Sequence, residues 1–180
     1  RRYPVCGLDI VLSAVTSRAF GTLPDGNSIA EYTVHNGPVE LRAITYGGII
    51  TSIRVPDRRG HRADVVLGHA TLEPYLRNRA YFGAIIGRYA NRIAAGRVQV
   101  DGVSYQLATN DGGNHLHGGA RGFDQHVWRA SPVTTSEGVG VTFTRTSPAD
   151  EEHYPGTLHV GVTYLVTPAG TVVVNYEATT

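Results

Sequence analysis

A short part of the chain gathers the side chains best suited to chemistry on a neutral ligand. Asn91 and Arg92 follow Gly87-Arg88-Tyr89-Ala90, and His117 lies within Asn114-His115-Leu116-His117-Gly118-Gly119. An amide and a forked guanidinium can hydrogen-bond hydroxyl groups, and an imidazole exchanges protons near neutral pH. Glycines beside both motifs let the backbone approach a ligand closely. These residue types favour grasping a polyhydroxyl ligand and moving a proton on it.

Each of these residues also has a purely structural interpretation. Asn91 and Arg92 could cap an irregular turn, with Arg92 paired to a local carboxylate, and a lone histidine such as His117 is more often structural. His115 and His117 are two residues apart, so on a strand both would face one side, as in half of a metal site. Since no carboxylate follows at a matching short spacing, we expect no metal ion. We expect His115 to lie behind the site or to face solvent.

Other polar and aromatic residues leave their roles open at this stage. Trp128 and Phe123 could stack on a ligand ring, although the alternating strand around Trp128 favours packing in the core. Arg88 fits either a binding role or a packing brace. The acidic run Asp150-Glu151-Glu152 predicts a solvated loop with His153 at the surface, because the run lacks the alternating ligand spacing of a calcium site.

The composition excludes several classes of partner. The 180 residues carry a formal net charge of +1 and 17% are charged, so no long-range field attracts nucleic acid or an anionic membrane. No apolar run approaches the roughly 18 residues of a membrane-spanning helix. The sequence contains neither a Gly-x-Gly-x-x-Gly turn nor a phosphate-binding loop, and we expect no cofactor. Cys6 is the only cysteine, so no internal disulfide can form.

Alternation of apolar and polar residues with a period of two dominates the chain and predicts β-strands separated by frequent turns. Asp101-Gly102 is the strongest hairpin signal. One helical turn is expected at 71–76 with Thr71 as its N-cap. The segment 81–93 has helical spacing but contains several glycines, so we expect it to be irregular and buried. Strands are predicted at 31–35, 39–46, 49–55, 63–68, 98–100, 103–107, 127–130, 139–145, 158–167 and 171–178.

This pattern predicts an all-β protein built as a large antiparallel β-sandwich. Residues 1–19 are expected to form an N-terminal extension that could be disordered, and residues 20–180 to form the sandwich. The chain begins with Arg1 and closes on the apolar strand around Val172-Val173-Val174. A long apolar strand at a sheet edge invites aggregation. We therefore expect an incomplete sandwich with more sheet to follow.

Many short motifs occur in a fixed order between Phe20 and Thr180, and the ordered set is far more specific than any one of them. They are Phe20-Gly21-Thr22, Tyr46-Gly47-Gly48-Ile49-Ile50, Val55-Pro56-Asp57, Val66-Leu67-Gly68, Tyr81-Phe82-Gly83-Ala84-Ile85-Ile86-Gly87-Arg88, Asn91-Arg92-Ile93, Asn114-His115-Leu116-His117-Gly118-Gly119, Gly122-Phe123-Asp124, Trp128, Tyr154-Pro155-Gly156 and Tyr176-Glu177-Ala178-Thr179. In this order the chain resembles the aldose 1-epimerases, also called galactose mutarotases.

The resemblance implies a β-sandwich of galactose-mutarotase type that interconverts the α and β anomers of free hexoses, galactose or glucose, without a cofactor. In that family the Asn-Arg pair and the histidine of the Leu-His-Gly-Gly motif line the sugar site. These positions are Asn91, Arg92 and His117 here. The family also uses a second histidine, an aspartate and a catalytic glutamate beyond the Glu177-Ala178-Thr179 strand. We therefore expect this chain to be the N-terminal portion, with the general base beyond Thr180.

Anomer exchange needs a base on the anomeric hydroxyl and an acid on the ring oxygen, so that the ring can open and reclose. We expect His117 to donate to, or orient, the ring oxygen as the catalytic residue, while Asn91 and Arg92 bind ring hydroxyls.

Two other functions stay open. One is a non-catalytic carbohydrate-binding sandwich. The other is a hexose-phosphate epimerase, which would need the arginines of the 58–62 turn at the phosphate. The expected partner is a monosaccharide, with neither nucleic acid nor a membrane, in a monomer or homodimer. We expect a cytoplasmic location, with secretion or the periplasm as alternatives.

Overall fold

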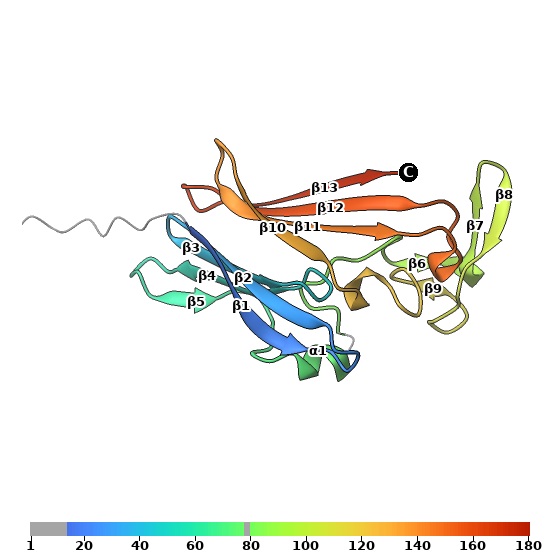
Figure 1. Cartoon of the computed structure of the whole chain (residues 1–180), viewed down its shortest axis with the longest axis horizontal. Coiled ribbons are helices and arrows are strands. Elements are labelled where there is room, and N and C mark those ends of the chain that lie inside the picture. Colours follow the sequence, from blue (N-terminus) through green and yellow to red (C-terminus); the bar gives the residue numbers. More distant parts are fainter. Residues whose placement is uncertain (1–13, 78–79) are drawn as a thin grey trace, which may run out of the picture.

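The computed structural model describes residues 14–77 and 80–180, in which two antiparallel sheets pack face to face (Figure 1). The first sheet has the order β1 (Ala14–Thr22), β2 (Ser28–Asn36), β3 (Val39–Ile44), β4 (Ile50–Pro56) and β5 (Arg62–Asp64). The second has the order β10 (Arg129–Thr134), β11 (Val139–Ser147), β12 (Leu158–Val166) and β13 (Val172–Thr179). The predicted antiparallel β-sandwich is confirmed.

The core lies between the sheets because alternate residues of each strand face inward. Leu41 of β3 and Phe143 of β11 are fully buried in one apolar cluster. Trp128 joins the cluster, packs edge-on against Phe123 with ring centroids 5.6 Å apart, and donates its indole N–H to the Phe123 carbonyl oxygen at 3.1 Å. Burial of each such large side chain contributes about 2 kcal/mol. Core packing of Trp128 is thus confirmed, and neither of these two rings is exposed to stack on a ligand.

Smaller elements connect the two sheets. The helix α1 (Glu73–Arg77) is short, β6 (Arg92–Ile93) pairs with β9 (His115–Leu116), and β7 (Arg97–Val100) pairs with β8 (Val103–Gln106). The β7–β8 hairpin turns at Asp101 and Gly102, whose φ values of 50° and 78° match the predicted two-residue turn. In Figure 1, β6 to β9 lie beside the end of the sandwich where β11 turns into β12. The described helices are all too short to cross a bilayer.

The predicted strand at 63–68 is shorter than expected. Strand β5 ends at Asp64, because its carboxylate accepts the backbone N–H groups of Ile53 at 3.1 Å and Val66 at 3.2 Å and turns the chain out of the sheet. The predicted strand at 127–130 begins only at Arg129, and helix α1 begins two residues beyond Thr71. The segment 81–93 is irregular, as expected from its glycines.

Strand β1 corrects the predicted boundary of the sandwich. Residues 1–19 were expected to form an extension, but β1 pairs with β2 from Ala14, opposite His35, to Thr22, opposite Ser28. The sandwich therefore includes at least six residues of that extension, from 14 to 19. Residues 1–13, with Cys6, and residues 78–79 lie outside the described residues.

Candidate functional site

The short ladder between β6 and β9 brings the three predicted site residues together. Arg92 lies opposite Leu116 in the register, so Asn91 and His117 meet at the end of the ladder. The backbone N–H of His117 donates to the Asn91 carbonyl oxygen at 3.1 Å, and the backbone N–H of Asn91 donates to Nδ1 of His117 at 3.0 Å. Both residues have positive φ, 65° for Asn91 and 52° for His117. The turn at Asn91 and the turn at His117 are therefore joined by two hydrogen bonds.

These contacts decide where the His117 proton sits. A backbone N–H can only donate, so Nδ1 accepts and the neutral imidazole carries its proton on Nε2. The ring of Tyr81 packs against the imidazole with centroids 4.7 Å apart and limits its rotation. His117 therefore presents an N–H donor on the ring nitrogen that Asn91 does not contact.

Arg92 is held by a carboxylate, as the structural interpretation of this residue expected. Its Nε donates to Oδ2 of Asp111 at 2.6 Å, and its Nη1 lies 3.5 Å from Oδ1 of Asn91. The guanidinium is more than half exposed, so this ion pair adds little stability but fixes an orientation. Nη2 bonds to no acceptor in the described part of the chain, so the guanidinium keeps donors for a ligand. A structural pairing and a binding role are therefore compatible.

The ring of His115 forms hydrogen bonds to different groups from those of His117. Its ring is 0% exposed, so the expectation that it could face solvent is wrong. Nδ1 donates to the Ala108 carbonyl oxygen at 2.8 Å, and Nε2 accepts from the hydroxyl of Tyr154 at 2.6 Å. Burial raises the pKa of Tyr154 to about 12, so this hydroxyl stays protonated as the donor.

The two histidines do not share a face as a regular strand would place them, because the positive φ of His117 ends the alternation. The rings of His115 and His117 accordingly bond to separate groups. Across residues 14–77 and 80–180, no three His, Cys, Asp or Glu side chains lie close enough together to hold a metal ion.

The acidic run that was expected to be a solvated loop is tied into the structure. The Glu151 carboxylate accepts hydrogen bonds from both terminal nitrogens of Arg145, at 2.7 and 2.8 Å. It also accepts a short hydrogen bond from Ser147 Oγ. Burial alone would raise the pKa of Glu151, but the hydrogen bonds from Arg145 and Ser147 outweigh burial and hold the pKa at about 2. His153 is exposed, as predicted. The sequence pattern did not predict these contacts of Glu151, because its partners Arg145 and Ser147 lie on strand β11.

Arg88 is a packing brace. Its guanidinium donates to Oγ and to the carbonyl oxygen of Ser147, at 2.8 and 3.0 Å, and to the carbonyl oxygens of Pro148 at 2.7 Å and Pro155 at 2.9 Å. These bonds use four of the five N–H groups of the guanidinium. Arg88 thereby fixes the segment 87–92 to the connection between β11 and β12.

The arginines that a sugar phosphate would need are far from this cluster. Arg58, Arg59 and Arg62 are exposed around the turn between β4 and β5, and Arg62 donates to the Pro38 carbonyl oxygen at 3.0 Å. In Figure 1, β5 and the β6–β9 ladder lie at opposite ends of the molecule. The arrangement does not favour a hexose-phosphate ligand that contacts both groups.

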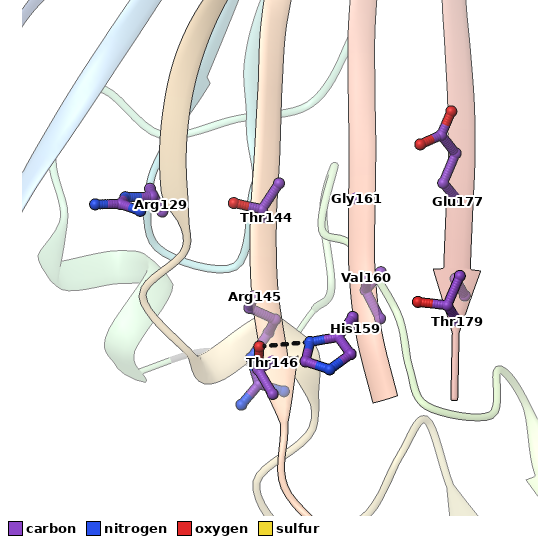
Figure 2. A pocket seen from close by; sticks show the side chains of 10 residues that line it. Arg129, Thr144, Arg145, Thr146, His159, Val160, Gly161, Glu177 and Thr179 are labelled. Atoms are coloured by element: carbon purple, nitrogen blue, oxygen red, sulfur yellow. Dashed lines mark hydrogen bonds between the residues drawn. The ribbon is translucent and has the colours of Figure 1, made fainter. Parts of the chain in front are cut away.

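A separate depression of about 480 Å³ lies on the sheet formed by β10 to β13 (Figure 2). Gly161 forms its floor, because the position across from Thr144 lacks a side chain. Sequence reasoning did not identify this depression, since its residues are spread over four strands with no motif in common. Its side chains on the outer face include Arg129, Thr144, Thr146, His159, Glu177 and Thr179.

Comparisons with known proteins agree on one family. Residues 30–180 match the family described as Aldose 1-epimerase. The galactose mutarotase of Homo sapiens is 47% identical over 168 residues, which cover 93% of this chain and 48% of the relative. The aldose 1-epimerase of Escherichia coli (strain K12) is 34% identical over 157 residues, 87% of this chain and 44% of the relative.

The fold is similar to a solved structure as well. The crystal structure of galactose 1-epimerase from Lactobacillus acidophilus NCFM superposes with a TM-score of 0.83 at 26% identity, covering 94% of this chain and 49% of that one. The chain spans about half the length of the curated relatives it matches.

Proposed function

Because the chain belongs to the aldose 1-epimerase family, we propose that it supplies part of a site that interconverts the α and β anomers of free hexoses such as galactose or glucose. The printed names of its relatives, galactose mutarotase and aldose 1-epimerase, support this reaction class. The reaction moves protons and changes no oxidation state, which suits a cluster of amide, guanidinium and imidazole groups.

The observation that carries the proposal is the hydrogen bond from the Asn91 backbone to Nδ1 of His117. This bond leaves Nε2–H as a directed donor, which can hydrogen-bond and polarise the ring oxygen of a hexose. Arg92 stands next along β6 and its remaining N–H groups can bind ring hydroxyls together with the Asn91 amide. A donor for the reacting oxygen and donors for binding thus come from one ladder.

Ring opening then proceeds by balanced proton transfers. A base takes the proton of the anomeric hydroxyl, the bond between the anomeric carbon and the ring oxygen breaks, and that oxygen takes a proton from solvent while the Nε2–H of His117 stabilises its developing charge through a hydrogen bond. The free aldehyde rotates, and closure on its other face returns both protons. Asp111 is held by Arg92 at 2.6 Å, which favours an orienting role for this carboxylate and not the role of base.

The engagement of Asp111 favours a second candidate function for this chain by itself, which is hexose binding without catalysis. In that case the donors of Asn91, Arg92 and His117 hold the sugar, but no proton leaves the anomeric hydroxyl. Binding would then be saturable, whereas the rate of anomer exchange would equal the uncatalysed rate.

Polarimetry of freshly dissolved α-galactose and α-glucose tests the proposal. In a protein that joins this chain to the segment supplying the general base, we expect His117→Ala to slow anomer exchange by about 100-fold or more, because loss of one positioned donor to a developing negative charge costs roughly 100- to 1,000-fold. His159→Ala, on the outer face of the sandwich, is the matched control and should keep the rate. A loss below about tenfold would show that His117 does not stabilise the ring oxygen during the reaction. Saturable binding by NMR without faster exchange would establish the second candidate.

The finer expectations on assembly and compartment stay predictions from the sequence. Light scattering would distinguish a monomer from a homodimer. Cell fractionation would distinguish a cytoplasmic location from secretion or the periplasm.

A further inference from the structure

The two glycines that follow His117 are required by two different neighbours. Gly118 has φ +89°, and a Cβ there would lie 1.7 Å from the carbonyl oxygen of Gly87. Gly119 has φ +110°, and a Cβ there would lie 2.1 Å from Oε2 of Glu152. The backbone after His117 is therefore packed between the segment that carries Asn91 and a carboxylate from a distant connection.

That carboxylate binds the backbone directly. Oε2 of Glu152 accepts the N–H of Ala120 at 2.7 Å, and Oε1 accepts the N–H of Arg121 at 2.9 Å. Successive backbone N–H groups that converge on one anion form a binding concavity, and hydrogen bonds to an ionised acceptor are the stronger kind. Glu152 thus fills an anion-binding turn that begins three residues after His117.

Glu152 is itself held from both sides. It lies in the 3-10 turn Glu151–His153, with φ +50°. The preceding Glu151 is clamped by Arg145, and Tyr154, just beyond the turn, donates to the buried ring of His115 at 2.6 Å. His115 is two residues before His117. The connection between β11 and β12 therefore binds the segment 115–121 twice, through Tyr154 at His115 and through Glu152 at Ala120 and Arg121.

We propose that Glu152 is a positioning residue for His117. Its carboxylate holds the turn at Ala120 and Arg121, and this turn keeps His117 in the positive-φ conformation in which Nδ1 accepts the Asn91 N–H. The consequence for hexoses rests on the proposed function above. The effect on the His117 proton does not.

The test compares Glu152→Ala and Glu152→Gln with Asp150→Asn, which removes a carboxylate from the same connection at an exposed side chain. NMR of the His117 ring nitrogens reports the tautomer, and amide hydrogen exchange reports the Ala120 and Arg121 N–H groups. In Glu152→Ala we expect both amides to exchange at least about tenfold faster and His117 to populate both tautomers, while Phe143 in the core stays protected. Added formate should refill the turn and partly restore the wild-type signals. Asp150→Asn should match wild type.

The outcomes separate a positioning role from a folding role. Unchanged His117 nitrogen signals in a folded Glu152→Ala protein would overturn the proposal. If the alanine variant unfolds, the glutamine variant decides between positioning and folding. Glu152→Gln keeps the side-chain volume and one acceptor oxygen. An unfolded glutamine variant would assign Glu152 to folding and overturn positioning. None of these readings needs a sugar, so a wild-type chain that binds no hexose would refute the proposed function and leave this test intact.

Discussion

At the scale of single residues, backbone conformation decides where the functional groups lie. Asn91 and His117 both adopt positive φ, which is uncommon for residues with a side chain, and each is held there by hydrogen bonds to the other. Glycine is needed at Gly118 for a second reason, since any side chain would meet the backbone of Gly87. The site therefore depends on close approach of main chains as much as on its side chains.

Two glycines with the same φ allow this steric requirement to be measured. Gly113 and Gly118 both have φ +89°, but no heavy atom lies within 4 Å of a Cβ built at Gly113. Gly113→Ala should cost about 1 kcal/mol of unfolding free energy, from the left-handed backbone alone. Gly118→Ala should cost at least about 3 kcal/mol, because the backbone must shift as well. Urea denaturation measures both, and equal losses would contradict the packing described here.

At the scale of elements, the connection between β11 and β12 braces the candidate site. It presents Glu151 to Arg145, Glu152 to the turn after His117, and Tyr154 to His115. Arg88 adds its hydrogen bonds to the same connection. A loop of this kind stiffens its neighbours because charged hydrogen bonds fix its conformation.

The Glu151 clamp predicts an acid-dependent loss of stability. The pKa of Glu151 is about 2 in the folded chain against an ordinary value of 4.5, so the folded state favours the ionised carboxylate. The contribution, on the order of 3 kcal/mol, is complete above the unfolded pKa and disappears as the pH falls from about 4.5 to about 2. Thermal melts should therefore show wild type losing its advantage over Glu151→Gln across that window. Glu137→Gln, exposed in the turn between β10 and β11, should follow wild type. A constant gap between wild type and Glu151→Gln would refute the shift.

At the scale of the whole molecule, the second sheet places β13 at its edge in the described structure. The strand runs from Val172 to Thr179 and exposes 40% of Val174 and 64% of Tyr176. An exposed apolar edge strand offers unpaired backbone groups to another chain. The isolated 180-residue chain should therefore associate as its concentration rises.

A charge at this edge should suppress the association. Tyr176→Lys places a charged side chain on the strand and should lower the apparent mass in light scattering at high concentration. Val103→Lys provides the control, because Val103 is also exposed but lies on the small β7–β8 hairpin. If both variants behave alike, association does not proceed through β13.

The strands and the family could be predicted because their signals are local. Alternation marked most strands of both sheets, and Asp101-Gly102 marked the hairpin between β7 and β8. The ordered motifs pointed to the family that the comparisons then showed. Short ladders such as β6–β9 escaped detection because two residues carry no period.

The sequence by itself determined which residue types were available for sugar chemistry and that alternating strands would form a sandwich, since both are written in neighbouring residues. Only the tertiary structure decided that His115 is buried against Tyr154, 39 residues away, and that Glu152 caps the turn at Ala120, 32 residues away. Such pairs leave no local pattern, because they form only when the sheets pack and bring distant loops to the same end of the sandwich.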